Sequence, residues 1–204
     1  MYLHHPPQWL RGLFPQITWK LPTDEKIIYL SFDDGPEPSV TPKVLKLLDD
    51  YKAKASFFCI GEKALKEKKL LEEIRQEAHA IGNHSFTHLN GWSTNTKDYL
   101  ADIEKCKQVI DSKLFRPPYG KITPPQLRAL LPTYKVVMWD VMSGDFDMNL
   151  KKEKCLKMLI KYTEKGSIPV LHDSIKASEK LMYVLPQILD HYSSKGFKFK
   201  AIPE

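Results

Sequence analysis

The chain has 204 residues, of which 42% are hydrophobic, and its 31 basic and 25 acidic residues give a formal net charge of +6. This length and composition predict one globular domain with a substantial core, and no apolar run is long enough for a transmembrane segment. The basic excess is mostly lysine and lacks the arginine and interleaved aromatic residues of nucleic-acid-binding surfaces, so we expect no nucleic-acid partner. We expect a monomer, with a weak preference for acidic polymers.

Residues 1–25 contain four prolines and are predicted to form an extended arm that packs across the main domain through Trp9, Phe14 and Trp19. The first 16 residues lack the continuous apolar core of a secretory signal. As written, the sequence therefore predicts a cytoplasmic protein. A cell-envelope location is the alternative if the N-terminus is processed or trimmed.

Beyond the arm, short apolar runs alternate with segments of helical periodicity. Seven strands are expected, at residues 27–32, 55–60, 80–84, 114–116, 135–141, 168–172 and 197–202. Apolar residues recur at helical spacing between them, as at Leu181, Leu185 and Ile188. This alternation predicts parallel strands with helices outside.

Three cysteines, Cys59, Cys106 and Cys155, fall inside apolar strand or helix patterns. Their number is odd and their spacing is unlike that of metal-binding Cys-x-x-Cys motifs. We expect buried free thiols rather than a disulfide framework.

The first predicted strand ends in the motif Ser31-Phe32-Asp33-Asp34-Gly35-Pro36. Adjacent residues of an extended strand point to opposite sides, so Asp33 and Asp34 face different surroundings. One can bind a metal ion while the other remains a base. A polar strand end followed by a Gly-Pro turn is the alternative, and this motif alone leaves both open.

His84 and His88 are separated by three residues. On a helical or turn-like segment, residues i and i+4 share a face, so both imidazoles can reach one divalent ion. Asp34 supplies a third ligand, and two imidazoles with one carboxylate suit zinc or a neighbouring transition metal. Such a set leaves coordination positions open to water and substrate, as in a catalytic site.

Three further clusters follow: Arg116-Pro117-Pro118-Tyr119-Gly120, then residues 139–146 (WDVMSGDF), then Val170-Leu171-His172-Asp173. With the two earlier motifs, and over residues 26–202, the chain resembles the polysaccharide deacetylase family, carbohydrate esterase family 4. The resemblance implies an α/β fold, a distorted (β/α)7 barrel similar to a TIM barrel, with residues 26–204 as a single catalytic domain. Each motif lies at or just beyond the C-terminal end of a predicted strand, where catalytic groups of such barrels converge.

The resemblance also implies a set of roles. Asp34, His84 and His88 would hold one divalent metal ion, zinc in our prediction, with cobalt or nickel as alternatives. Asp33 would be the catalytic base that takes a proton from water, and Arg116 would pair with Asp33 and orient it. The metal ion would activate water and polarise an acetamide carbonyl.

On the opposite wall, His172 is the predicted general acid and Asp145 the carboxylate that keeps it protonated. The backbone N–H of Tyr119 would help to hold the oxyanion. Leu171 would line a small acetyl pocket, and Phe146, together with Tyr119, would contact the sugar.

The resemblance predicts a hydrolase that removes N-acetyl groups from N-acetylglucosamine-type sugars of a polysaccharide, either peptidoglycan or a chitin-like chain. Met142 stands where the family often has an aspartate and Phe146 where a tryptophan is common, so we expect a less polar and slightly wider groove. Two alternatives stay open. One is an O-acetyl esterase or an amidase acting on a non-glycan substrate. The other is a glycan-binding protein without catalysis.

Overall fold

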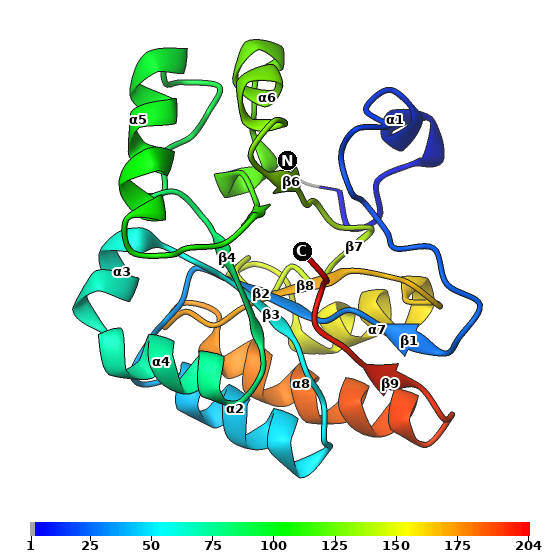
Figure 1. Cartoon of the computed structure of the whole chain (residues 1–204). Coiled ribbons are helices and arrows are strands. Elements are labelled where there is room, and N and C mark those ends of the chain that lie inside the picture. The colour runs from blue at the N-terminus through cyan, green and yellow to red at the C-terminus, as the bar shows by residue number, and fades with distance from the viewer. Residues whose placement is uncertain (1–2) are drawn as a thin grey trace.

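The computed structural model describes residues 3–204, and Met1 and Tyr2 lie outside the described residues. A curled sheet of seven parallel strands lies at the centre, surrounded by helices (Figure 1). Across the sheet, the strands are β6 (Lys135–Val136), β5 (Leu114–Phe115), β4 (Ala80–Asn83), β3 (Ser56–Cys59), β2 (Ser31–Asp33), β8 (Pro169–His172) and β7 (Val141–Met142). The predicted distorted seven-stranded barrel in a single domain is confirmed.

The helices connect successive strands and lie outside the sheet. They are α2 (Thr41–Asp50), α3 (Gly61–Lys66), α4 (Lys68–Gln76), α5 (Thr96–Lys107), α6 (Pro124–Leu130), α7 (Lys152–Tyr162) and α8 (Ser178–Ser193). The apolar residues predicted at helical spacing in α8 are buried, which confirms the pattern. None of the helices within residues 3–204 combines the length and apolar character that a membrane crossing needs.

The largest part of the core lies between the sheet and the outer helices. Phe32 on β2 and Leu171 on β8 are register partners, and both belong to this cluster together with residues of α2, α4 and α8. The Phe32 ring stacks on Phe57 of β3 with centroids 5.0 Å apart. Since neighbours along a strand alternate, the residues before and after Phe32 point into the barrel.

The predicted strand at 27–32 divides into two strands that belong to different sheets. β1 (Ile27–Ile28) pairs with β9 (Lys198–Phe199), and β2 joins the central sheet. Between them, the Tyr29 N–H donates to the Ser167 carbonyl, so the chain changes partners without leaving that group unpaired. The strand predicted at 197–202 therefore lies outside the central sheet.

The predicted strand at 135–141 also divides, because residues 137–140 cross from one edge of the sheet to the other. β6 pairs with β5 at one edge and β7 pairs with β8 at the opposite edge. Buried Asp140 fixes the crossing by accepting hydrogen bonds from the Ile168 N–H and the Ser167 hydroxyl, each at 2.7 Å. The seventh strand of the barrel is thus a product of this division.

The N-terminal arm, described from Leu3, fills the seam between β6 and β7. Thr18 forms a parallel bridge with Val137, and the Met142 N–H donates to the His4 carbonyl at 2.7 Å. The arm includes a short helix, α1 (Gln8–Gly12), drawn in dark blue at the upper right of Figure 1. The division of the chain into an arm and a catalytic domain stays a prediction.

Of the three aromatic residues expected to anchor the arm, two lie against the core. Phe14 and Trp19 pack against a cluster that includes Ile17 and residues of α5 and α6. The prediction for Trp9 is wrong, because this side chain lies on α1 and is 69% exposed. The three cysteines are buried and free, as predicted.

We expect the arm to contribute to stability through Ile17, which is 7% exposed, and not through Leu13, which is 63% exposed. Ile17→Ala should lower the free energy of unfolding by about 2–4 kcal/mol, because it leaves a cavity in the core. Leu13→Ala should change it by less than about 0.5 kcal/mol. Urea unfolding followed by fluorescence measures both, and equal effects would show that the arm does not form part of the core.

Candidate metal centre and active site

The predicted site residues converge at the C-terminal ends of the parallel strands. Asp33 ends β2, His84 follows β4, Arg116 follows β5, and His172 ends β8. Asp33 and His172 are register partners on adjacent strands. The barrel therefore brings residues more than 130 positions apart in the sequence into one site.

Arg116 is fully buried and pairs with Asp33. Its Nη1 donates to Asp33 Oδ1 at 2.6 Å and to Ser31 Oγ at 2.9 Å, and its guanidinium lies 4.0 Å from the Phe58 ring centroid. Its other nitrogens donate to the carbonyls of residues 137 and 138. A buried charge needs such complete pairing, and Asp33 is consequently held in one orientation.

The backbone turns sharply after Asp33, since Asp34 has φ 77°. Asp34 Oδ1 lies 3.2 Å from His88 Nε2 and 3.7 Å from His84 Nε2. One ligand atom from each of these three residues lies within 4.8 Å of the others. Their spacing and donor types fit a single divalent ion.

The protonation states of the donors also suit a metal ion. His84 Nδ1 lies 2.8 Å from the Arg116 carbonyl, which can only accept, so Nδ1 carries the proton and Nε2 is left free for a ligand. Burial lowers the pKa of His84 to about 4, which keeps its imidazole neutral. Burial opposes ionisation of Asp34, yet its hydrogen bond with His88 and the nearby histidines hold its pKa well below the usual range.

The segment carrying the histidines is a loop, so the helical form of the i, i+4 interpretation is wrong. Ser85 and His88 have φ of 58° and 61°, and this turn, not a helix face, brings the two rings to a centroid distance of 5.0 Å. Asp102 on α5 holds the loop by accepting from the backbone N–H groups of Phe86 and Thr87 at 2.8 and 3.0 Å. Asp102 belongs to none of the five sequence motifs, so its role was not predicted.

On the opposite wall, His172 and Asp145 form the predicted pair. His172 Nδ1 lies 2.8 Å from Asp145 Oδ1, and the His172 backbone N–H donates to Oδ2 at 2.8 Å. The Ser143 hydroxyl also donates to this carboxylate. Burial disfavours the charged imidazole, but the hydrogen-bonded Asp145 carboxylate, with the nearby Asp34 and Asp33, outweighs burial and raises the pKa of His172 to about 9.

Tyr119 lies at the edge of the metal centre, in the 3-10 turn η1 (Pro118–Gly120). It has φ 59°, its ring is 4.5 Å from that of His88, and its side chain is 60% exposed. The next two N–H groups, of Gly120 and Lys121, are used within the turn. Its assigned roles, an oxyanion-holding N–H and a sugar contact, stay predictions.

The expectation that Leu171 lines an acetyl pocket does not fit the structure. Leu171 is fully buried in the cluster beneath α8, on the opposite face of β8 from His172. Val170 shares the face of His172. Met142 is also buried, in a cluster with Val170, so it does not line the open groove. Phe146 does border the site, with its ring edge-on to His172 at 4.8 Å.

Asp173 is a second supporting residue that the sequence did not single out as part of the site. It is fully buried and accepts a hydrogen bond from the Thr41 hydroxyl at 2.5 Å. Burial raises the pKa of its carboxyl to about 7. A Cβ added to Gly35 would collide with this carboxyl, so the loop that carries Asp34 lies directly against it.

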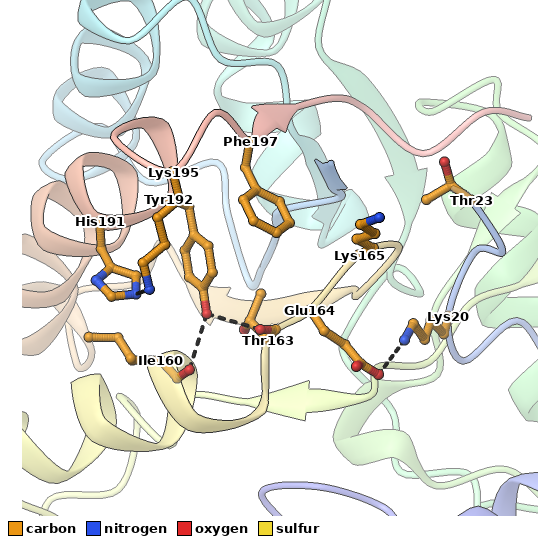
Figure 2. A pocket seen from close by; sticks show the side chains of 10 residues that line it. All are labelled: Lys20, Thr23, Ile160, Thr163, Glu164, Lys165, His191, Tyr192, Lys195 and Phe197. Atoms are coloured by element: carbon orange, nitrogen blue, oxygen red, sulfur yellow. Dashed lines mark hydrogen bonds and ion pairs between the residues drawn. The ribbon is translucent and has the colours of Figure 1, made fainter. Parts of the chain in front are cut away.

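A cavity of about 580 Å³ lies at the other end of the barrel. Figure 2 shows that it is lined by residues preceding β1, β8 and β9, including Lys20, Lys165 and Lys195. Glu164 pairs with Lys20 there. The cavity contains none of the predicted site residues, and active sites of parallel barrels form at the C-terminal ends of the strands. We therefore place the candidate site at the metal centre.

Comparison with known proteins finds similar chains over most of the sequence. The family model described as polysaccharide deacetylase matches residues 20–132. A peptidoglycan-N-acetylglucosamine deacetylase of Bacillus cereus is 33% identical, with 92% of each chain covered. The peptidoglycan-N-acetylmuramic acid deacetylase PdaA of Bacillus subtilis is 31% identical over 89% of this chain and 72% of its own.

Among solved structures, a peptidoglycan N-acetylglucosamine deacetylase in complex with 4-naphthalen-1-yl-N-oxidanyl-benzamide superposes with a TM-score of 0.88. The two sequences are 27% identical, and the match covers 97% of this chain and 95% of the other. The similarity therefore extends over the arm as well as the barrel.

We expect Asp102→Ala to weaken zinc binding about 10–100-fold, because the loop that carries both histidines loses its anchor. Glu104→Ala, on the same helix but exposed, is the control. Competition with a chromophoric chelator measures the affinity, and circular dichroism checks the fold. Unchanged affinity in a folded Asp102 variant would show that the loop holds its shape without this carboxylate.

Proposed function

The chain belongs to the polysaccharide deacetylase family, and we propose that it removes N-acetyl groups from N-acetylglucosamine-type sugars of peptidoglycan. Family membership makes it a metal-dependent deacetylase of acetylated glycans. The observation that carries the proposal is the joint presence of three elements in one site. These are the Asp34–His84–His88 donor set, the Asp33–Arg116 pair and the His172–Asp145 pair.

The donor set fits a divalent ion, because two imidazoles and one carboxylate face one another, with His84 buried and Asp34 and His88 partly exposed. We propose zinc, with cobalt or nickel as alternatives. Once bound, the ion would supply Lewis-acid activation of water and of the acetamide carbonyl.

Asp33 is suited to accept the proton of the attacking water. Asp33 is 4% exposed, and its Oδ1 accepts a hydrogen bond from Arg116 Nη1, so the carboxylate is held in one orientation. Asp33 directly precedes Asp34 in the chain, but it is not one of the three donor residues. We assign Tyr119 N–H to the oxyanion that develops on the substrate.

His172 is suited to protonate the departing amine. Its Nδ1 is engaged by Asp145, which leaves Nε2 for the substrate, and the carboxylate favours the charged imidazole. An amine is a poorer leaving group than an alcohol, so a strong general acid favours work on the amide. This is our reason for placing N-deacetylation ahead of O-acetyl esterase activity.

The direct test is acetate release by the purified protein, loaded with zinc or cobalt, from N-acetylglucosamine oligomers and from acetylated xylan. We expect faster release from the N-acetylated glycan. Asp33→Asn should retain the metal ion and lose about 10²–10⁴-fold in kcat. Much faster release from xylan would make the protein an esterase, and full activity of the Asp33 variant would remove this residue as the base.

The pH profile tests the acid. His172 must be protonated to act, and its raised pKa keeps it so until the pH rises through about 9, where activity should fall. Asp145→Asn removes the charge that raises this pKa, so the alkaline limb of kcat should move to lower pH by about one to three units. Asp98→Asn, at the exposed start of α5, is the control. If the alkaline limb of kcat did not move in the Asp145 variant, that limb would report the titration of a group other than His172.

A further inference from the structure

A shelf of three side chains lies beside the metal centre: Trp92, Lys121 and Tyr119. Trp92 is 67% exposed on the loop after β4, and Tyr119 contacts the metal ligand His88. Lys121 Nζ lies 5.3 Å from the Trp92 ring centroid and 5.9 Å from that of Tyr119. The three side chains therefore form one surface that begins at the metal centre and extends away from it.

The loop that presents Trp92 is held rigidly. Asn90 Oδ1 accepts from the Trp92 N–H at 3.0 Å, and the Trp92 indole N–H donates to the Ile122 carbonyl at 3.3 Å. Buried Gln126 donates to the carbonyls of Gly91 and Thr94. The indole thus exposes its surface from a fixed position, with its one polar group already satisfied.

This arrangement has no evident packing purpose. A large apolar side chain that stays exposed on a rigid loop contributes little to the core, while such anchors are characteristic of binding sites. Half of the eight large hydrophobic residues that are exposed within residues 3–204 lie on loops after strands of the central sheet: Trp92, Tyr119, Met148 and Ile175. The catalytic face therefore carries several exposed apolar side chains besides Trp92.

Lys121 adds a charge to the shelf. Its ammonium is within about 6 Å of both ring centroids, the range of cation–π attraction. It forms no ion pair with any carboxylate of the described chain. A cation that is ordered by two aromatic rings and left without an anion is suited to bind a carboxylate of a ligand.

We propose that this shelf binds the sugar adjacent to the one being deacetylated, and that it selects glycans in which that sugar carries a carboxylate. The inference rests on the proposed function and deepens it. The apolar C–H face of the sugar would lie on the Trp92 indole, and its carboxylate would reach Lys121. The favoured substrate class is an acidic amino-sugar chain rather than a neutral chitin-like chain.

The experiment compares two tetrasaccharides with the zinc-loaded enzyme. One contains only N-acetylglucosamine, and the other alternates N-acetylglucosamine with N-acetylmuramic acid that bears a free lactyl carboxylate. Trp92→Ala should raise KM about tenfold for both, with a smaller effect on kcat. Lys121→Gln should raise KM about fivefold or more for the acidic substrate alone, and should weaken the dependence of that KM on salt.

The chain offers matched controls. Trp9→Ala removes a tryptophan of similar exposure, 69%, from the arm, and Lys161→Gln removes a lysine that lies 4.8 Å from the Tyr162 ring centroid on α7. Both should leave KM within about twofold of the wild-type value. The proposal is overturned if Trp92→Ala matches Trp9→Ala, or if Lys121→Gln affects the two substrates equally.

Failure of the proposed function has a different signature. If the wild-type enzyme released no acetate from either tetrasaccharide, the reaction assignment would be wrong, and the shelf would then be tested by binding alone. Isothermal titration of the two tetrasaccharides to the Asp33→Asn protein, with and without Trp92→Ala, provides that measurement. Equal affinities with and without Trp92 would overturn the shelf as well.

Discussion

The buried pair formed by Arg116 and Asp33 is the interaction on which the site depends. Arg116 comes from the end of β5, Asp33 from the end of β2, and the carbonyls that complete the guanidinium shell come from the segment crossing between β6 and β7. A fully buried guanidinium is costly unless all of its donors are paired. The requirement to pair them brings three separate parts of the barrel together at Asp33, the residue next to the metal ligand Asp34.

This pair also explains how two adjacent aspartates acquire different chemistry. Strand alternation points Asp33 into the barrel toward Arg116, whereas the left-handed backbone at Asp34 turns the next carboxylate toward His84 and His88. Left-handed geometry recurs at Ser85, His88 and Tyr119, and such backbone strain commonly accumulates at functional sites. Asp102 holds the histidine loop by hydrogen bonds to its backbone, and Asp173 packs against Gly35 in the loop of Asp34.

Much of this was predictable from the sequence, because strand-end motifs and helical periodicity depend on local patterns. Six of the seven predicted strand runs contribute to the central sheet, and the buried cysteines and the convergence of five motifs also follow from such patterns. The division of the runs at 27–32 and 135–141 was not predictable, since it depends on partners elsewhere, such as Ser167 and Thr18. Leu171 was assigned to the wrong face because a sequence motif does not show which side chains of a strand point into the barrel and which point toward the outer helices. Asp102 was missed because a single acidic residue on a helix resembles an ordinary solvated one.

The seam that the arm fills has a consequence for the order of assembly during synthesis. Thr18 and His4 leave the ribosome early, yet their partners Val137 and Met142 are made more than 100 residues later. A growing chain must therefore carry the arm undocked, with Ile17 and Trp19 exposed, while most of the sheet is translated. The arm contacts residues that are far away in the sequence, and such contacts form more slowly than the local contacts of a helix. The first residues to be made are thus among the last to reach their native contacts.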